Sequence, residues 1–548
     1  MRIALLLSYL TISLTTFAQV GEWTWMSGSN SAASPVGVYG IQGVSSAANH
    51  PPGLYEACEW TDLQGNFWLF GGLAGNGMQS TLWKYNPLIN EWTWVQGSAL
   101  PSQPASYGTL GVPSPTNTPG ARAYGCISVT DLNGDLWLFG GADAFGFKSD
   151  LWRYTIASNM WTWMGGPGGT GDAGTYGTQG VPSTSNIPGA RGETAAGWCD
   201  DNNNIWLFGG MGPGSAVTYN DLWKYNIATG EWTWMRGSAY AVNAPSVYGT
   251  LGVASPLNEP CGREVYAHWK DAAGNFWIYG GETFNTQTEQ LGDLWKYDPA
   301  INQWTWMNGS PIPESEGQFP ILCDENDTSE VPSQMEDRSC WTDTCGNFWL
   351  YGGALNYAFT NLWCYIIADN SWIMVEGSGA FPQLPLFGTM GVSSPTNRPG
   401  GKTGANAWRD NSGNLWLFGG GNGSSWGDLW RYVPDYDCIG TCTSSPPPPP
   451  PPPSDTSLFS VPNVFTPNGD NTNDIFEVTV IGYDSYAIEI YDRWGVQVFH
   501  ADDTLIHWNG TMNNAGANCS DGTYYYIITL VDRAQITTRH TGFFTLIR

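Results

Sequence analysis

The chain has 548 residues, with 20 Lys and Arg against 48 Asp and Glu, and therefore a formal net charge of −28. This acidic balance excludes a nucleic-acid binder, which needs clustered basic residues for phosphate contacts. Glycine contributes 70 residues, and 31 Trp, 26 Tyr and 21 Phe supply apolar bulk for large cores. Together these features exclude a disordered chain and predict a turn-rich, all-β protein.

The N-terminal segment is typical of a secretory signal peptide. Arg2 precedes an apolar run over residues 3–14, and residues 16–18 (Thr-Phe-Ala) form a small-x-small ending. We expect cleavage before Gln19, so that residues 1–18 are absent from the mature protein. No other stretch approaches 18 consecutive apolar residues, so we expect no transmembrane segment after cleavage.

A repeat with a period of 68 to 72 residues follows. Each full unit contains a Gly-Gly doublet at the end of an apolar run, then Leu-Trp-x-Tyr, and five units also contain Trp-x-Asp. The motif Trp-Thr-Trp, which becomes Trp-Ile-Met in the last copy, begins at Trp23, Trp92, Trp161, Trp232, Trp304 and Trp372. Four short apolar stretches per unit, separated by turn residues, predict four β-strands per unit.

The order of the motifs predicts how the array of repeats closes. The first motif is an isolated fourth strand at Trp23, and the last third strand, around Trp430, has no fourth strand after it. We therefore expect the N-terminal strand to pair beside Leu429–Tyr432 and complete the sixth unit.

The six copies of the Gly-Gly doublet, followed at wider spacing by Trp and Tyr, resemble the repeats of the kelch family over residues 20–437. The resemblance implies a six-bladed kelch-like β-propeller, which we assign to residues 19–437. The unit is longer than the kelch repeat of about 50 residues. The extra length is a long segment, such as residues 107–122, that joins the fourth strand of one unit to the first strand of the next.

Basic residues stand at the ends of these long segments, on the face that we expect to receive all the long loops. They are Arg122, Arg191, Arg263, Arg338 and Lys402. We expect a basic collar at the mouth of the channel that binds an anionic ligand such as a uronic or sialic acid. Trp426 is expected on the rim of this site, whereas most other Trp belong to repeated packing positions. The alternative is that each basic residue pairs with carbonyls or carboxylates and fixes its loop.

The sequence favours a binding protein without a cofactor, whose ligand is an extracellular glycan or protein, over an enzyme. The resemblance to the kelch family includes galactose oxidase, whose copper site needs two His and two Tyr, one of them linked to Cys. The repeats contain only His50 and His268, in unlike positions. A mutarotase-like or other glycan-acting kelch enzyme stays as the alternative.

The eleven cysteines are spread thinly over the chain. Cys438 and Cys442 lie in a short loop, and we expect them to form a disulfide in an oxidising compartment. Four others fall at nearly the same place in successive repeats, which predicts buried side chains too far apart to pair; they are Cys58, Cys126, Cys199 and Cys340.

Residues 438–456 are predicted to be a linker. The eight consecutive prolines of residues 446–453 should form a polyproline rod of roughly 25 Å, at about 3.1 Å per residue. The rod would separate the repeats from the C-terminal domain without contributing to either core.

The last segment, residues 457–548, alternates short strands and turns, which predicts a small Ig-like β-sandwich. Its motifs include Val-Pro-Asn-Val-Phe-Thr-Pro-Asn-Gly-Asp (461–470) and Asp-Gly-Thr-Tyr-Tyr-Tyr (521–526). They resemble the gliding-motility-associated C-terminal domain, the type B sorting domain of type IX secretion substrates in Bacteroidetes-type bacteria. The resemblance implies recognition by the type IX secretion machinery and delivery to the cell surface or the medium. Asp470 and Asp474 are candidate Ca²⁺ ligands, with an Asx-rich turn as the alternative.

Overall fold

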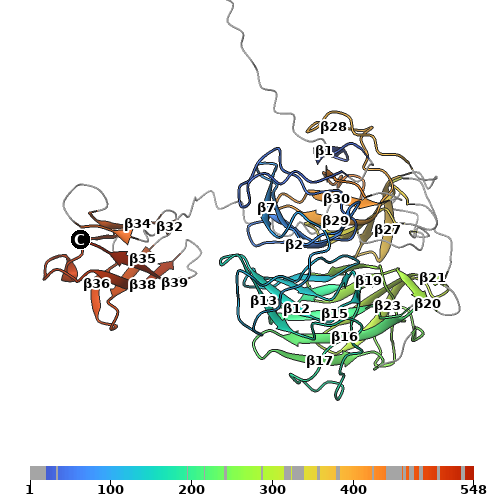
Figure 1. Ribbon diagram of the computed structural model, residues 1–548, viewed down its shortest axis with the longest axis horizontal. Coiled ribbons are helices and arrows are strands. Elements are labelled where there is room, and N and C mark those ends of the chain that lie inside the picture. The colour runs from blue at the N-terminus through green and yellow to red at the C-terminus, as the bar shows by residue number, and fades with distance from the viewer. Residues whose placement is uncertain are drawn as a thin grey trace, which may run out of the picture. The chain divides into compact units, whose positions relative to one another are not determined.

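The computed structural model contains two compact units, Met1–Thr443 and Ser444–Arg548, which we describe separately (Figure 1). The predicted signal peptide and the proline run lie outside the described residues. These residues are 20–31, 35–193, 196–214, 216–239, 243–284, 288–313, 322–323, 332, 339–353, 358–377, 383–421, 425–439, 459–460, 464–467, 474–480, 485–502, 506–531 and 537–548. The prediction of an all-β chain is confirmed, because the helical structure in these residues is the single 3₁₀ turn η1 (Met512–Asn514).

In its described residues the first unit contains six large antiparallel sheets, each with four strands in chain order apart from the sixth, which has five. Sheet 1 contains β2 (Cys58–Thr61), β3 (Phe67–Phe70), β6 (Leu82–Asn86) and β7 (Glu91–Gln96). Sheet 2 contains β8 (Ile127–Thr130), β9 (Leu136–Phe139), β12 (Leu151–Thr155) and β13 (Met160–Gly165). Sheet 3 contains β14 (Gly197–Cys199), β15 (Asn204–Met211), β16 (Thr218–Asn226) and β17 (Glu231–Arg236).

The remaining sheets repeat this plan. Sheet 4 contains β18 (Ala267–Lys270), β19 (Phe276–Tyr279), β22 (Gly292–Asp298) and β23 (Gln303–Ser310), and sheet 5 contains β24 (Ser339–Thr342), β25 (Phe348–Tyr351), β26 (Leu362–Ile366) and β27 (Ser371–Glu376). Sheet 6 contains β29 (Thr403–Arg409), β30 (Leu415–Gly421), β31 (Asp428–Tyr432), β1 (Trp23–Gly28) and the short β28 (Ser393–Ser394). Three small hairpins extend the loops between second and third strands: β4 (Leu73–Ala74) with β5 (Gly77–Met78), β10 (Ala142–Asp143) with β11 (Gly146–Phe147), and β20 (Glu282–Phe284) with β21 (Thr288–Gln290).

The N-terminal strand completes sheet 6, as the motif order predicts. Trp23 is opposite Tyr432, and Trp25 is opposite Trp430, in an antiparallel pairing of β1 with β31. The two ends of the first unit therefore share one sheet, and Figure 1 shows β1 beside the orange strands of sheet 6. Backbone hydrogen bonds rather than a covalent link join residues about 400 positions apart.

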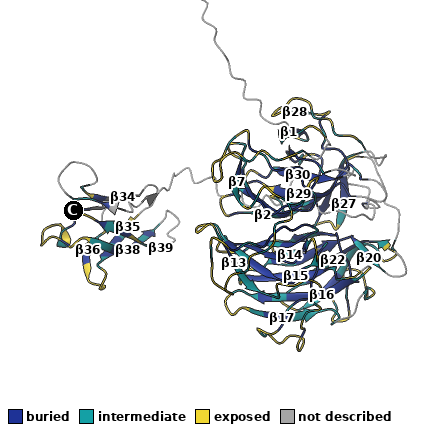
Figure 2. Ribbon diagram, in the orientation of Figure 1, coloured by how far each residue is buried: buried dark blue, intermediate teal, exposed yellow. Residues whose placement is uncertain are grey.

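Apolar clusters join each sheet to the next one in the chain, and a further cluster joins sheet 6 back to sheet 1. Aromatic rings stack across these junctions: Phe67 lies 5.2 Å from Trp408, and Trp198 lies 4.7 Å from Phe276, both between ring centroids. The second strands are accordingly almost completely buried, whereas the fourth strands are partly exposed (Figure 2). The sheets thus contact one another in a cyclic order, and most tryptophans serve to fill the junctions.

A repeated turn ends each first strand. In sheet 1, Asp62 Oδ1 accepts hydrogen bonds from the backbone N–H of Gln64 and Asn66, and Oδ2 accepts one from Trp68 Nε1 at 2.8 Å. Gly65 has φ of 80°, which favours glycine at this position. We call these the Asp turns; the equivalent carboxylates are Asp131, Asp200, Asp271, Asp343 and Asp410. These six acidic side chains therefore serve the fold.

The disulfides differ from the predicted ones. Cys438 bonds to Cys323, with the two Cα atoms 4.9 Å apart, whereas Cys442 lies outside the described residues. Cys438 and the next residue, Ile439, also pack into the core between sheets 5 and 6, so the predicted linker begins after them. The expected pairing is wrong because Cys438 is bonded to a cysteine that lies 115 residues earlier in the sequence.

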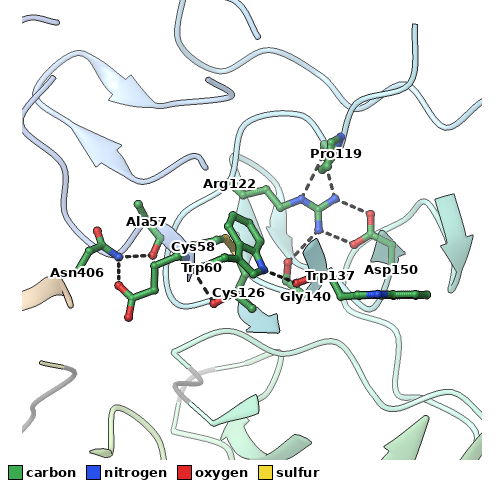
Figure 3. Close-up of a disulfide and its surroundings, with 12 residues drawn as sticks. Ala57, Cys58, Trp60, Pro119, Arg122, Cys126, Trp137, Gly140, Asp150 and Asn406 are labelled. Carbon is green, nitrogen blue, oxygen red and sulfur yellow. Dashed lines mark hydrogen bonds and ion pairs between the residues drawn. A yellow bond between two sulfur atoms is a disulfide. The ribbon is translucent and has the colours of Figure 1, made fainter. Parts of the chain in front are cut away.

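Cys58 and Cys126 also form a disulfide, with a Cα separation of 5.6 Å (Figure 3). The sequence predicted that cysteines of different repeats lie too far apart. However, the first strands of adjacent sheets run side by side, since Thr130 Oγ1 of β8 donates to the carbonyl of Thr61 of β2 at 2.9 Å. Cysteines at the beginning of neighbouring first strands therefore meet within the range that a disulfide spans.

The second unit contains two sheets around one core. The first is β32 (Phe459–Ser460), β34 (Phe476–Val480) and β37 (Ile506–Trp508), and the second is, in spatial order, β33 (Val464–Phe465), β39 (Thr537–Leu546), β38 (Gly522–Val531), β35 (Ser485–Tyr491) and β36 (Gln497–Ala501). All pairs are antiparallel except β33 with β39. Phe476, Trp508 and Phe544 are fully buried between the sheets, with Phe476 and Phe544 stacked at 3.9 Å.

Candidate functional site

The basic residues at the ends of the long segments are buried. In sheet 3, Arg191 donates from Nη1 and Nη2 to the two carboxylate oxygens of Asp221 at 2.7 and 2.8 Å, and Nη1 also donates to the carbonyl of Gly209. Tyr176 and Trp223 donate to the same carboxylate at 2.6 and 2.7 Å. Arg191 is 1% exposed and Asp221 is 0% exposed. The guanidinium therefore faces a carboxylate and a Gly-Gly doublet inside the protein.

The same pairing recurs in three other sheets, where every partner is 0% exposed: Arg122 with Asp150, Arg263 with Asp293, and Lys402 with Asp428. Figure 3 shows Arg122 between Asp150 and the carbonyls of Pro119 and Gly140. Burial favours a higher pKa for Asp150, but the Arg122 guanidinium and the surrounding donors hold that pKa below its ordinary value. These four cations do not face solvent as a collar. Their contacts match the alternative prediction, in which each basic residue pairs with carbonyls or carboxylates and fixes its loop.

In sheet 1, uncharged residues occupy both positions of the buried ion pair. Leu54 takes the position of the basic residue, since its carbonyl accepts from Gly420 N–H as that of Arg122 accepts from Gly72 N–H. Thr81 replaces the aspartate and accepts from Trp83 Nε1 at 3.1 Å. Acid and base are thus replaced together, as expected because an unpaired buried charge is costly.

The fifth sheet leaves one predicted basic residue unplaced. Asn361 precedes the third strand there, where the other sheets carry Asp or Thr, and it is buried. Arg338 lies outside the described residues.

Trp426 is buried rather than placed on a rim. It is 9% exposed, its ring centroid lies 6.2 Å from that of Phe387, and Lys402 Nζ lies 5.7 Å from its ring. Trp426 therefore covers the buried ion pair of sheet 6 and has little surface for a ligand.

The candidate Ca²⁺ ligands remain a prediction. Asp470 lies outside the described residues, and Asp474 is half-buried just before β34. In the part of the chain that the structure describes, no three His, Cys, Asp or Glu side chains are grouped as a metal site.

The long segments run along the outer edges of the sheets, where they form hydrogen bonds with the fourth strands. In sheet 2, Gly111 N–H donates to the carbonyl of Trp163 at 2.8 Å, and Asn117 Nδ2 donates to that of Trp161 at 3.0 Å. Equivalent asparagines contact the fourth strands of four more sheets: Asn49, Asn186, Asn258 and Asn397. An outer strand has unpaired backbone groups, so a covering segment satisfies them and blocks edge-to-edge association.

A cavity of about 370 Å³ lies between the first strands of five sheets. Residues that alternate along these strands line it, and they include Glu59, Ser128, Thr130, His268 and Lys270. Each first strand begins at the end of a long segment and finishes at an Asp turn. The residues that line the cavity extend along the first strands, from Gly197 at the beginning of β14 to Thr61 at the end of β2.

The lining of this cavity combines apolar residues, such as Trp60 and Val129, with polar residues that are largely paired. Glu59 Oε2 accepts from Asn406 Nδ2 at 2.6 Å and from the backbone N–H of Ala407 at 3.0 Å. Lys270 Nζ forms an ion pair with Asp201 at 2.7 Å. Burial raises the pKa of the Cys199 thiol to about 11, so this cysteine is protonated at neutral pH and is a poor nucleophile. The arrangement suits hydrogen bonding to a polar ligand.

Sequence reasoning passed over these residues because it used the tryptophan of the Trp-x-Asp motif and not the position before it. That position contains Glu59 in sheet 1 and His268 in sheet 4, and Ser128 takes the equivalent place in sheet 2. Side chains alternate between the two faces of a strand. Where the tryptophan side chain lies in the junction between sheets, the side chain before it therefore lies on the other face, toward the cavity. The alternation of side chains along the first strands was the sequence signal that could have located these residues.

Comparison with known proteins identifies the second unit. Residues 459–546 match the CHU_C type IX secretion signal domain. Among curated proteins, none matches the chain in sequence. In the described part of the chain, helices of the length and apolar character needed to span a bilayer are absent. The C-terminal domain is therefore a type IX secretion signal, which supports recognition by the type IX secretion machinery and export to the cell surface or beyond.

Proposed function

We propose that the first unit is a six-bladed kelch-type β-propeller and that the exported protein uses it to bind an extracellular glycan or protein. Five four-stranded sheets and the five-stranded sheet 6, their cyclic order of contacts and the completion of sheet 6 by β1 support the propeller. A closed ring of sheets leaves only short, protected edges. The Gly-Gly doublets and the recurring Trp and Tyr support the kelch assignment.

We propose that export has two steps. Residues 1–18 direct the chain across the inner membrane, and the C-terminal domain directs it across the outer membrane. The domain match supports the second step. The Ig-like sandwich is proposed on two sheets that share one core.

The axial cavity is the observation that carries the binding function. Its volume of about 370 Å³ falls in the range of small-molecule pockets, about 300–1,000 Å³. The volume suits a single polar unit, such as the terminal sugar of a glycan or a polar side chain of a protein.

The charges of the lining favour a neutral, hydroxylated ligand over the anionic one first expected. Glu59 and Lys270 each have partners within the protein, and the buried arginines contribute no exposed positive charge. Hydroxyl groups of Thr61, Ser128 and Thr130 line the same space. Donors and acceptors from several sheets thus surround one volume, as in a site for a polyol.

The test uses the full-length protein on a glycan array and in pull-downs from culture medium with identification of the bound partner. Ser128→Phe fills the cavity and should weaken binding at least tenfold. Lys296→Met is the matched control, because this lysine belongs to β22 of sheet 4 and is absent from the cavity lining. Binding unchanged in a folded Ser128→Phe protein would overturn the site, and release of sugar products would favour the glycan-acting enzyme.

A further inference from the structure

The five-stranded sheet of the second unit has two unlike faces. On one face, Ile490, Tyr524 and Phe544 are buried in the core shared with the smaller sheet. On the other face, Tyr525 is 50% exposed and Phe543 is 67% exposed. Successive residues of a strand point to opposite faces, so these neighbouring aromatics divide between core and solvent.

The two exposed aromatics form one row with a half-buried tyrosine. Tyr525 of β38 is directly opposite Phe543 of β39 and, on its other side, directly opposite Tyr491 of β35. Opposed residues on neighbouring strands have Cβ atoms roughly 4.5–5.5 Å apart, so the three side chains lie side by side. We call Tyr491, Tyr525 and Phe543 the outer aromatic row. Ile527, two residues along β38, extends the apolar surface on the same face.

A third exposed aromatic lies beside the row. Trp494, in the turn after Tyr491, is 73% exposed, and the guanidinium of Arg493 lies 4.9 Å from its ring centroid. Arg493 is also exposed and donates to the carbonyl of Asp521, which precedes β38. The turn is therefore tied to the same sheet that carries the outer aromatic row.

Such exposure is unusual within this chain. The described residues contain four aromatic side chains that are mainly exposed, and three of them, Trp494, Tyr525 and Phe543, belong to the smaller unit; the fourth is Phe145. The solvent face of an antiparallel sheet is ordinarily polar. Grouped apolar side chains on a surface mark an interaction site.

We propose that the outer aromatic row, with Trp494 and Arg493, is the surface by which a protein of the type IX secretion machinery recognises this chain. The proposal rests on the export role of the domain, because a secretion signal must present a surface to its receptor. Trp, Tyr and Arg are the residue types that contribute most to protein–protein binding energy. A sheet face holds them rigidly, so little conformational entropy is lost when the receptor binds.

The first experiment measures export of the full chain in a bacterium with type IX secretion. The double variant Tyr525→Thr, Phe543→Thr removes two rings and keeps residues that favour strands. Export should fall at least tenfold, with accumulation in the periplasm and an unchanged melting curve of the purified protein. Phe145→Thr is the matched control, since it removes an exposed ring from the other unit, and its export should equal that of the parent.

A second variant keeps the test decisive if the double variant does not fold. Trp494→Ser changes a turn residue outside the strands and should lower export at least threefold. Normal export of folded protein by both sets of variants would overturn the proposal. If deletion of residues 459–546 still blocks export in that case, the domain is the signal and the receptor reads another surface.

Photo-crosslinking identifies the occupant of the surface. p-Benzoylphenylalanine in place of Phe543 in exporting cells should give a product with a component of the type IX machinery, identified by mass spectrometry. The same group in place of Phe145 should not give it. A product within the chain itself, or with surface polysaccharide alone, would overturn the assignment of the receptor.

Discussion

Both units bury aromatic side chains in their cores, but they differ in the aromatic side chains that they leave on the surface. In the first unit, the tryptophans of Leu-Trp-x-Tyr are all 2% exposed or less, because every sheet is covered by the next. In the second unit, the outer face of the larger sheet retains an exposed aromatic row. Aromatic residues stabilise the fold where they are buried between the repeated sheets of the first unit. On the outer face of the second unit, the same residue types are exposed and accessible to a partner.

The strongest way to separate the two roles is to remove residues 459–546. Because this segment is the type IX signal domain, we expect export to be lost and the first unit to accumulate in the periplasm. Cell fractionation with immunoblotting measures the distribution. Surface delivery at the parental level would contradict the assignment, and a folded first unit, shown by protease resistance, is the control.

Breaking a buried ion pair should have the largest effect within the first unit. Arg191→Ala leaves Asp221 without its partner at 0% exposure, and such a change costs about 3–5 kcal/mol. The urea-induced transition, followed by Trp fluorescence, measures the loss.

Sheet 1 supplies the matched control for this prediction. Arg191→Leu with Asp221→Thr copies Leu54 and Thr81, so no buried charge is left unpaired. The double variant should be more stable than Arg191→Ala. Equal losses would mean that the charge pair matters less than the shape of the site.

The fold was largely predictable from the sequence, since periodic motifs report which residues must be buried. The pairing of β1 with β31 followed from counting motifs, and that prediction is confirmed. The candidate site was less predictable because an arginine at the end of a loop looks the same in sequence whether it faces solvent or a carboxylate. Only the structure brings Arg191 to Asp221, 30 residues later in the chain.

The disulfides were missed for a related reason. Spacing in sequence suggested Cys438 with Cys442, whereas Cys438 bonds to Cys323, 115 residues earlier. Cys58 and Cys126 were expected to be apart, because the repeat pattern does not show how closely neighbouring first strands approach.

Removal of the Cys323–Cys438 bond tests how far covalent links add to the closed order of sheets. Cys438→Ser should lower the free energy of unfolding of the first unit by about 2–4 kcal/mol, because the bond restricts the unfolded chain. Cys340→Ser, which changes a cysteine outside the described disulfides and keeps a donor for the carbonyl of His268, is the control in the same urea titration. An unchanged transition midpoint in Cys438→Ser would show that packing and the pairing of β1 alone restrain this end of the unit.

The last prediction concerns the contact between the closing strand and sheet 5. Trp23 Nε1 donates to Glu376 Oε2 at 2.6 Å, and burial raises the pKa of Glu376 to about 7 from the ordinary 4.5, against the lowering effects of Trp23 and Arg398. The folded protein therefore keeps this proton at pH values where the unfolded chain has lost it. The resulting stabilisation is complete below about pH 4.5 and is lost as the pH rises toward 7.

Glu376→Gln removes the titration and keeps a hydrogen-bond acceptor for Trp23 Nε1. Melting temperatures measured from pH 5 to pH 8 should therefore fall less in Glu376→Gln than in the parent, with the difference largest between pH 5 and pH 7. Glu91→Gln, on the outer strand β7 of sheet 1, should leave the parental slope unchanged. Parallel curves for the parent and Glu376→Gln would mean that the carboxylate is ionised in the folded protein throughout this range, and that β1 is held by its backbone pairing and apolar contacts alone.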